Sequence, residues 1–413
     1  MKVLIIGFVW PEPKSSAAGS RMMQLIQFFL AENYTVTFAT STSKTENAIN
    51  LKSLGIHEQT IELNSSTFDD FISQLQPDIV LFDRFLIEEQ FGWRVAQQCP
   101  KAIRILDTED IHGLRKGREL ALKNNTPFNV EYLHNDTSKR EIASIYRCDV
   151  SLIISEAEME LLTQEFGVPT ELLHYMPFLI EPIADEGKRK LPVFEDRNHF
   201  ITIGNFLHPP NLDSVKFLYQ SIWSKIRTKL PKAEMHIYGA YQNNKAQQFK
   251  TNDNGFIIKG FAEDVNDVMQ QAKVCLSPLR FGAGLKGKFF DAMRNGTPFV
   301  TTSIGAEGIL ESSYMNTLNS EDVDAIVEYA IRLYSDKKLW QEQQNLGYNL
   351  LEKRFGKSYH IETFKQKLQY VVEHLKECRQ NNFTGQMLMH HTLQSTKYMS
   401  KWIEEKNKKT KTN

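Results

Sequence analysis

The segment from Ser277 to Thr301 combines small, basic and acidic residues in an order suited to phosphate binding. Its loop consists of Gly282, Ala283, Gly284 and Leu285, and small residues let a ligand approach the backbone closely. Lys286 and Lys288 follow at the expected start of a helix, where free N–H groups and a partial positive charge attract anions. One turn further on, the carboxylate of Asp291 can accept hydrogen bonds from ribose hydroxyls.

Regular elements on both sides are expected to hold this loop in place. Val274–Leu276 is a short apolar run that ends at a turn, which is typical of a buried strand. Apolar residues at helical spacing follow Lys288, and Asn295–Gly296 is a helix stop before a second apolar strand, Phe299–Thr302. An ordinary helix start with solvated lysines would use the same residue types, so that interpretation stays open.

The N-terminal residues predict a βαβ unit with a ligand loop of its own. Val3–Val9 is typical of a strand buried on both faces, and a helix that opens near Gly19 leads to a strand at Thr35–Ala39. Open parallel sheets bind ligands at the carboxyl ends of their strands, so the loop between this strand and helix should face a ligand. Gly19 and Arg21 are the candidate contacts, although Arg21 suits a solvated helix position equally well. The absence of G-x-G-x-x-G argues against a dinucleotide cofactor.

Charged residues follow two further predicted strands, Ile79–Phe82 and Ile103–Leu106. The candidate site residues at these two strand ends are Asp83, Asp110, His112 and Arg115. Because the carboxyl ends of neighbouring parallel strands meet at one edge, we expect these side chains in one cleft. A carboxylate or a neutral imidazole there can bond ligand hydroxyls, although a backbone carbonyl or amide could also satisfy His112. The spacing of the acids and the histidine is not that of a structural metal site, so no metal is predicted.

A similar turn follows the predicted strand Phe200–Ile203. Gly204 opens it, and His208 lies just before Pro209 and the next helix. His208 could reach a ligand at this strand end or pack against Pro209.

The composition is that of a globular protein long enough for two domains. The chain has 413 residues, of which 41% are hydrophobic and 24% charged. A formal net charge of -1 gives no general attraction for nucleic acid. The four cysteines are scattered without a C-x-x-C pair, which fits a reducing cytoplasm. The expected first strand starts at once, which is unlike a signal peptide, and no apolar run reaches membrane-spanning length.

Three further motifs give the chain a family resemblance. Arg147–Glu158, Arg294–Val300 and Gly305–Gly308 are similar, in this order, to three motifs of the group 1 glycosyltransferases. The chain resembles these retaining sugar-transfer enzymes most over residues 200–310. The resemblance implies an α/β protein of the GT-B fold, with two Rossmann-like, doubly wound parallel-sheet domains facing a central cleft. In the first motif, Ser155 and Glu158 have the spacing of a helix capping box, which predicts a structural role.

The resemblance also implies roles for the segments and candidate residues. It places an acceptor-side domain at 1–180, a linker at 181–198, a nucleotide-sugar-binding domain at 199–357 and a returning helix with a basic tail at 358–413. Donor-binding residues would be Gly204, His208, Gly282, Ala283, Gly284, Leu285, Lys286, Lys288 and Asp291; catalytic residues Asp83, Asp110 and His112; and acceptor-side residues Gly19, Arg21 and Arg115. The implied donor substrate is a nucleotide diphosphate sugar, without cofactor or metal, and the implied acceptor is a glycan, a lipid-linked molecule or a protein.

One position departs from the family pattern and leaves alternatives open. The family has two glutamates, of which the second corresponds to Asp291 and the first, a sugar contact, to Ala283. We expect a variant enzyme with an F-G-A-G-x-K-x-K loop. A non-catalytic nucleotide-sugar-binding partner protein and a nucleotide-sugar epimerase are the alternatives, whereas the missing dinucleotide motif disfavours a dehydrogenase.

The C-terminal tail from Gln380 has two interpretations. Met387, Met389 and Trp402 precede a lysine-rich end, as in a helix that lies on a membrane surface. We favour a last helix packed on the first domain, and leave peripheral contact with the inner membrane face open.

Overall fold

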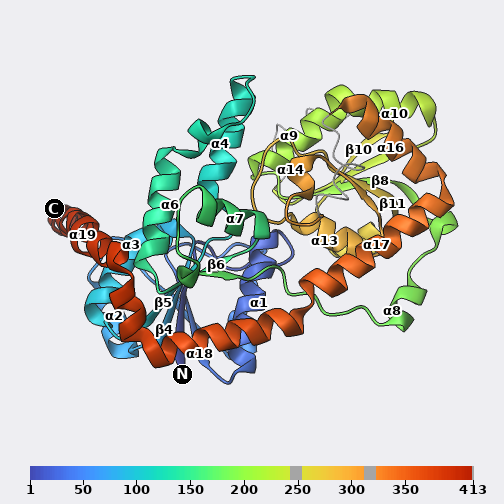
Figure 1. Cartoon of the computed structure of the whole chain (residues 1–413). Helices are drawn as coiled ribbons and strands as arrows, with labels where there is room; N and C mark the ends of the chain where they lie inside the picture. Colours follow the sequence, from blue (N-terminus) through green and yellow to red (C-terminus); the bar gives the residue numbers. More distant parts are fainter. Residues whose placement is uncertain (242–253, 311–321, 412–413) are drawn as a thin grey trace.

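The computed structural model describes residues 1–241, 254–310 and 322–411, which form two α/β domains (Figure 1). The strand order is β3-β2-β1-β4-β5-β6-β7 in the first sheet and β10-β9-β8-β11-β12 in the second. All paired strands run parallel. These two parallel-sheet domains confirm the expected fold class.

The elements have the following bounds. The first sheet contains β1 (Lys2–Ile6), β2 (Thr35–Thr40), β3 (His57–Thr60), β4 (Ile79–Asp83), β5 (Ile103–Asp107), β6 (Val150–Ile153) and β7 (Leu173–Tyr175). Its helices are α1 (Ala17–Ala31), α2 (Thr67–Leu75), α3 (Phe85–Gln98), α4 (His112–Lys123), α5 (Val130–Leu133), α6 (Asp136–Arg147) and α7 (Glu156–Gln164). The second sheet contains β8 (Asn198–Ile203), β9 (Met235–Tyr238), β10 (Phe256–Gly260), β11 (Ala272–Leu276) and β12 (Phe299–Val300). Its helices are α9 (Pro209–Phe217), α10 (Trp223–Lys229), α12 (Val265–Gln271), α13 (Gly287–Arg294), α14 (Ser303–Ala306), α16 (Val323–Ser335) and α17 (Lys337–Phe355), with α8 (Asp185–Lys190) between the domains and α18 (Lys357–Asn381) and α19 (Phe383–Lys411) at the end.

Apolar side chains cover both faces of the first sheet. On β1, Leu4 and Ile6 belong to one buried apolar cluster, whereas Val3 and Ile5 belong to another. Successive side chains of a strand point to opposite faces, so a continuous apolar run suits a sheet with helices on both sides.

The first strand is shorter than the sequence predicted. It ends at Ile6, and Phe8 and Val9 beyond it are 37% and 44% exposed. The prediction of a strand to Val9 was wrong because apolar content alone does not separate a buried strand from the exposed start of a loop.

The chain crosses between the domains at two adjacent points. Ile180 donates its N–H to the carbonyl of Phe355 (2.9 Å), and Lys357 donates to the carbonyl of Ile180 (2.9 Å). From there α18 runs back along the first domain (Figure 1), and its Phe364 and Leu368 complete one of the apolar clusters on β1. Arg379 near its end pairs with the buried carboxylate of Asp149 (2.7 Å).

The last helix packs on the first domain, as we favoured. α19 lies against α3 and α6, and Arg94 of α3 pairs with Glu404. Tyr398, Met399 and Trp402 remain exposed on this helix.

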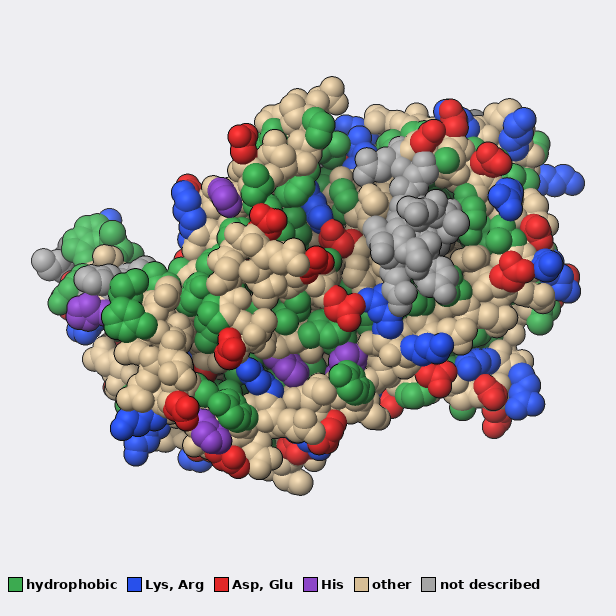
Figure 2. All heavy atoms as spheres, in the orientation of Figure 1, with side chains coloured by type: hydrophobic (Ala, Val, Ile, Leu, Met, Phe, Trp, Pro, Cys, Tyr) green, Lys and Arg blue, Asp and Glu red, His purple; other side chains and the backbone are tan. Residues whose placement is uncertain are grey.

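The surface of the molecule carries charges of both signs. Figure 2 shows acidic and basic side chains interspersed over the face in view, in keeping with the near-zero net charge. Among the described helices, none combines the length and the apolar character that crossing a membrane requires.

Candidate functional site

Each sheet has a position where the strand order reverses, and ligands of open α/β sheets bind outside the carboxyl ends of such strands. In the first sheet this position lies between β1 and β4, and in the second between β8 and β11. The predicted site residues follow these strands and the neighbouring β5, and contacts between the two domains bring several of them together.

The loop at 282–285 and the start of α13 form the second domain's side of the site. Lys286 is the N-cap of α13, and no side chain caps this helix. Lys288 donates to Asn211 Oδ1 (2.8 Å) and to Ser277 Oγ (3.2 Å) at the end of β11, whereas Lys286 donates to the carbonyl of Gly284 (2.8 Å). The lysines therefore lie at the uncapped helix end, as expected for a phosphate site.

Burial changes the charge state of this helix start. It lowers the pKa of Lys286 and that of Lys288 to about 8, so both ammonium groups remain largely protonated at neutral pH. Burial also raises the pKa of Asp291 to about 6, with Arg294 opposing the rise. A bound phosphate would stabilise the charged lysines further.

Side chains of the first domain hold the loop at 282–285. Arg118 of α4 donates to the carbonyl of Gly282 (2.8 Å) and forms a two-bond pair with Glu307 (2.8 and 2.6 Å). Glu158 of α7 is fully buried, and its Oε1 accepts the N–H groups of Gly284 (2.8 Å) and of Ile111 (2.9 Å). The loop is thus fastened to the opposite domain through its backbone.

Gly284 shows why the loop needs its smallest residue. Its φ is +62°, in the left-handed region, and an added Cβ would lie 2.8 Å from Cβ of Asp110 in the first domain. Any larger residue would strain the backbone and push the two domains apart.

Two of the predicted donor contacts, Ala283 and Leu285, have side chains that pack in the apolar interior. Ala283 packs in an apolar cluster of the first domain, and Leu285 packs in an apolar cluster around α13. Both are buried, at 9% and 7% exposure, so their side chains strengthen the junction between the domains, and only their backbone groups remain as donor contacts.

The acid at the end of β4 is buried. Asp83 Oδ2 accepts the N–H of Phe8 (2.9 Å), and its Oδ1 lies 3.5 Å from Nε of Arg84. Burial raises the pKa of Asp83, while Arg84 and the Phe8 N–H oppose the rise. The structure therefore places Asp83 at the reversal between β1 and β4, in contact with the loop after β1.

The predicted residues after β5 form a connected group. Asp110 pairs with Arg115, and His112 Nδ1 lies 3.3 Å from Asp110 Oδ1. Burial alone would raise the pKa of Asp110, but Arg115, His112 and His208 together hold it well below its usual range. The ring of His112 also lies 3.1 Å from Oε1 of Glu141, so α6 fixes its orientation.

His208 brings the second domain to this group. The surroundings of its ring and nearby Arg115 lower the pKa of His208 to about 4, which leaves the ring neutral at physiological pH. Gly204, at the start of the same turn, packs against Asn211, because an added Cβ would lie 2.7 Å from its side chain.

The two acceptor-side candidates on α1, Arg21 and Gly19, are buried. Arg21 is 1% exposed, pairs with Asp107 (2.8 Å) and donates to the carbonyl of Met176 (2.6 Å). Gly19 is also buried, and an added Cβ would lie 2.4 Å from the backbone of Glu12. Arg21 thus ties α1 to β5 and to the chain after β7, and Gly19 allows α1 to approach the loop after β1.

The structure adds residues that sequence reasoning missed. Glu158 was expected in a capping box, but Ser155 makes no side-chain cap bond and Glu158 instead binds two backbone amides. Arg118 has no local signal, whereas Glu307 lies in the Gly-Ala-Glu-Gly turn that the resemblance had noted. Glu109, between two predicted site residues, has a φ of +63°.

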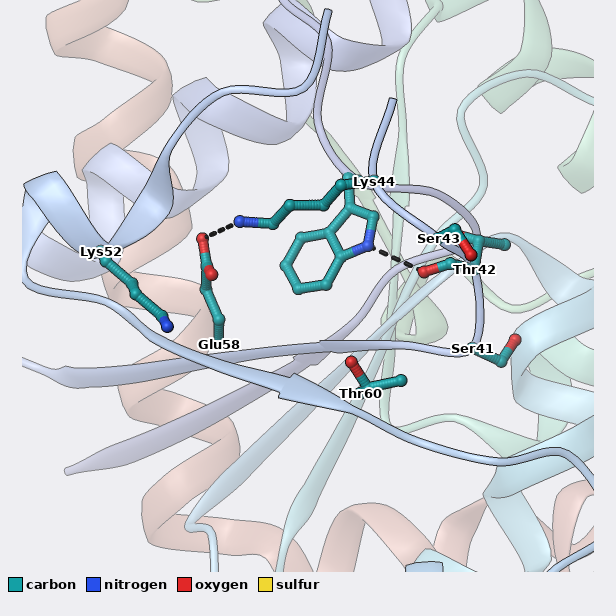
Figure 3. A pocket seen from close by; sticks show the side chains of 8 residues that line it. Ser41, Thr42, Ser43, Lys44, Lys52, Glu58 and Thr60 are labelled. Carbon is teal, nitrogen blue, oxygen red and sulfur yellow. Dashed lines mark hydrogen bonds and ion pairs between the residues drawn. The ribbon is translucent and has the colours of Figure 1, made fainter. Parts of the chain in front are cut away.

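A polar pocket of about 290 Å³ lies at the ends of β2 and β3 (Figure 3). It is lined by Trp10, Ser41, Thr42, Ser43, Lys44, Lys52, Glu58 and Thr60. Lys44 lies over the Trp10 ring (4.6 Å) and pairs with Glu58 (2.6 Å). The pocket borders the loop after β1, so it is near the carboxyl edge of the first sheet.

Comparisons with known proteins agree with this geometry. Residues 197–336 match the family model described as Glycosyl transferases group 1. A variant of S. aureus TarM, solved with Fondaparinux, α-GlcNAc-glycerol and UDP, is similar with a TM-score of 0.68 and 10% identity over 89% of this chain and 99% of that one. Sucrose-phosphate synthase from Thermosynechococcus elongatus has a TM-score of 0.67 and 14% identity, over 90% of this chain and 99% of that one. HepE from Anabaena, solved with UDP and glucose, has a TM-score of 0.66 and 12% identity, over 89% and 99%.

The similar solved structures show that the chain has the GT-B fold, and the match to the group 1 model is confined to residues 197–336. An "uncharacterized 44.6 kDa protein in cps region" from Klebsiella pneumoniae is 25% identical over 179 residues, or 41% of this chain. That match spans 43% of the Klebsiella protein.

Proposed function

We propose that the chain is a group 1 glycosyltransferase that moves a hexosyl residue from a nucleotide diphosphate sugar to a hydroxyl of a glycan acceptor. The observation that carries this proposal is the uncapped start of α13, where Lys286 and Lys288 lie beside the loop at 282–285 and the end of β11. Supporting it, the similar TarM variant and HepE were both solved in complex with UDP.

The proposed reaction keeps the configuration of the anomeric carbon and uses no metal. The bond between this carbon and the diphosphate oxygen breaks, and the acceptor oxygen bonds to the same carbon on the same face. The acceptor proton passes to the departing phosphate. Helix N–H groups and both lysines stabilise the charge that develops on the leaving group, so the protein's contribution is positioning and electrostatics.

The acceptor binds on the first domain in this proposal. Asp110 and His112 lie at the cleft, and the polar pocket at Trp10 has room for a further acceptor unit. A role in polysaccharide synthesis is supported by the name of the Klebsiella relative. We place the reaction in the cytoplasm, with the exposed Tyr398, Met399 and Trp402 of α19 available for contact at the inner membrane face.

Isothermal titration with UDP-, GDP- and dTDP-sugars tests the donor site. One donor should bind saturably, and Lys286→Ala should weaken it roughly 10- to 100-fold, because a hydrogen bond to a charged group contributes about 1.5–3 kcal/mol. Lys216→Ala, an exposed lysine of α9 in the same domain, is the matched control and should bind like the wild type. No binding of any donor by folded protein would refute the proposal.

A non-catalytic partner protein is the second candidate, because Ala283 is packed in the junction and supplies no carboxylate. Turnover distinguishes the two. Donor binding with no transfer to any acceptor, and no epimerised donor, would favour the non-catalytic protein.

A further inference from the structure

Glu109 occupies a backbone conformation that suits glycine and not glutamate. Its φ is +63°, and it follows the end of β5. A residue with a side chain is strained in this region, so the conformation persists only where the surrounding structure imposes it. The neighbouring strand β4 has the same feature, since Arg84 has a φ of +74°. Two strained charged residues thus lie at adjacent strand ends.

The carboxyl group of Glu109 is available to a ligand. The residue is half-buried, and within the described part of the chain no hydrogen bond or ion pair reaches its side chain. Asp83 beside it is 4% exposed, and its Oδ1 has no hydrogen-bond partner among the described atoms. Buried polar atoms normally have partners, so Asp83 Oδ1, which Arg84 approaches only to 3.5 Å, can accept a hydrogen bond from a polar ligand beside Glu109.

Glu109 also lies directly against the donor loop. An added Cβ on Gly284 would be 3.4 Å from the carbonyl oxygen of Glu109. The backbone of Glu109 therefore lies beside the loop at 282–285, in which Ala283 supplies no carboxylate, while Asp83 and Arg84 of the first domain act on its carboxyl group.

We propose that Glu109 hydrogen-bonds a hydroxyl group of the transferred sugar and so recognises the sugar part of the donor. This inference rests on the proposed function and names the residue that selects the sugar. In the same proposal, Asp83 Oδ1 accepts a second hydrogen bond from a hydroxyl group of this sugar.

The chemistry of the site favours a neutral carboxyl group at Glu109. Burial raises the pKa of Glu109 to about 8; Asp107 and Asp83 add to the rise, while Arg84 and Arg21 oppose it. A neutral carboxyl group can donate and accept a hydrogen bond with one sugar hydroxyl, and it does not repel the donor diphosphate. Glutamine has the same donor and acceptor pattern and is neutral at every pH.

The test compares each nucleoside diphosphate with its sugar derivatives: UDP, GDP and dTDP with the UDP-, GDP- and dTDP-sugars. In the wild type, one sugar derivative of the accepted nucleotide should bind more tightly than the nucleotide alone. Glu109→Gly should bind the sugar derivative roughly tenfold more weakly than the wild type does, while its affinity for the nucleoside diphosphate alone stays unchanged. Glu109→Gln should keep the gain at pH 7 and, unlike the wild type, also above pH 8.

Thermal unfolding separates this role from a structural one. Glu109→Gly should raise Tm by about 2–4 °C, because glycine adopts a positive φ without strain. Asn125→Gly is the matched control: it also has a positive φ (+53°), is exposed and should leave sugar affinity unchanged. A lower Tm for Glu109→Gly, or unchanged sugar affinity, would overturn the inference.

Two further outcomes distinguish the inference from the proposed function. If the wild type binds a nucleoside diphosphate and all of its sugar derivatives equally, the inference fails while the donor site stands. If it binds neither, the proposed function fails, and the inference with it.

Discussion

Glu158 should make the folded protein lose stability as the pH rises, and Glu158→Gln should remove that loss. The side chain is fully buried, and its Oε1 accepts two backbone N–H groups, from Ile111 and Gly284. Burial raises its pKa to about 8 from an ordinary value of 4.5, with Asp110 adding to the rise and the Ile111 N–H opposing it. The folded protein therefore holds a proton that the unfolded chain releases.

The magnitude follows from proton linkage. Below pH 4.5 both states carry the proton on Glu158, and the free energy of unfolding is not affected. Between pH 4.5 and about 8 only the folded state carries it, so the free energy of unfolding falls by 1.36 kcal/mol per pH unit. At pH 7.5 the loss reaches about 4 kcal/mol, as an order of magnitude. Glutamine takes up no proton, and its oxygen can still accept both N–H groups.

Urea unfolding at pH 5 and pH 8 measures this effect. Glu158→Gln should be more stable than the wild type at pH 8 and should show a smaller difference at pH 5. Glu160→Gln, an exposed residue on the same helix, should keep the wild-type pH dependence. Glu158→Leu should be less stable than Glu158→Gln at both pH values, because two buried amides lose their acceptor at about 1–3 kcal/mol each. An unchanged pH dependence in Glu158→Gln would refute this reasoning.

Two further predictions concern donor binding. Arg118→Gln should weaken binding of the accepted nucleoside diphosphate roughly tenfold, because it frees the carbonyl of Gly282 and breaks the pair with Glu307. Titration calorimetry of Arg118→Gln, Glu307→Gln and the double variant should show strong non-additivity, and simple additivity would count against a shared contact. Nucleotide affinity should also fall as the pH rises through about 8, where Lys286 and Lys288 lose their protons. Lys286→Met should make that fall less steep, and an equally steep fall would show that other groups cause it.

The sequence predicted the main elements of the site because local patterns define them. The apolar run before Ser277 forms β11, and the helix start at Lys286 and the helix stop at Asn295 agree with α13. These boundaries depend on periodicity and on glycine and capping residues, all of which act within a few positions.

The contacts between the domains could not be predicted in the same way. Arg21, Ala283 and Glu158 are ordinary residues in their local sequence, and their roles come from Asp107, from an apolar cluster and from Gly284, far along the chain. Local propensity carries no information on such partners. The local sequence therefore predicts an acceptor contact for Arg21 and a helix-capping role for Glu158, and it gives no sign of the contacts with Asp107 and Gly284. The positive φ of Glu109 likewise had no signal in the sequence.

The return of α18 to the first domain has a consequence for the order in which the chain can fold during synthesis. Phe364, Leu368 and Val371 complete an apolar cluster whose other members lie between Val3 and Leu179. The domain that leaves the ribosome first therefore lacks part of its interior until the second domain has been made. A nascent chain that stops before Lys357 would expose this apolar surface, which makes it a target for chaperones and proteases. Translation must deliver almost the whole chain before its first half is stable.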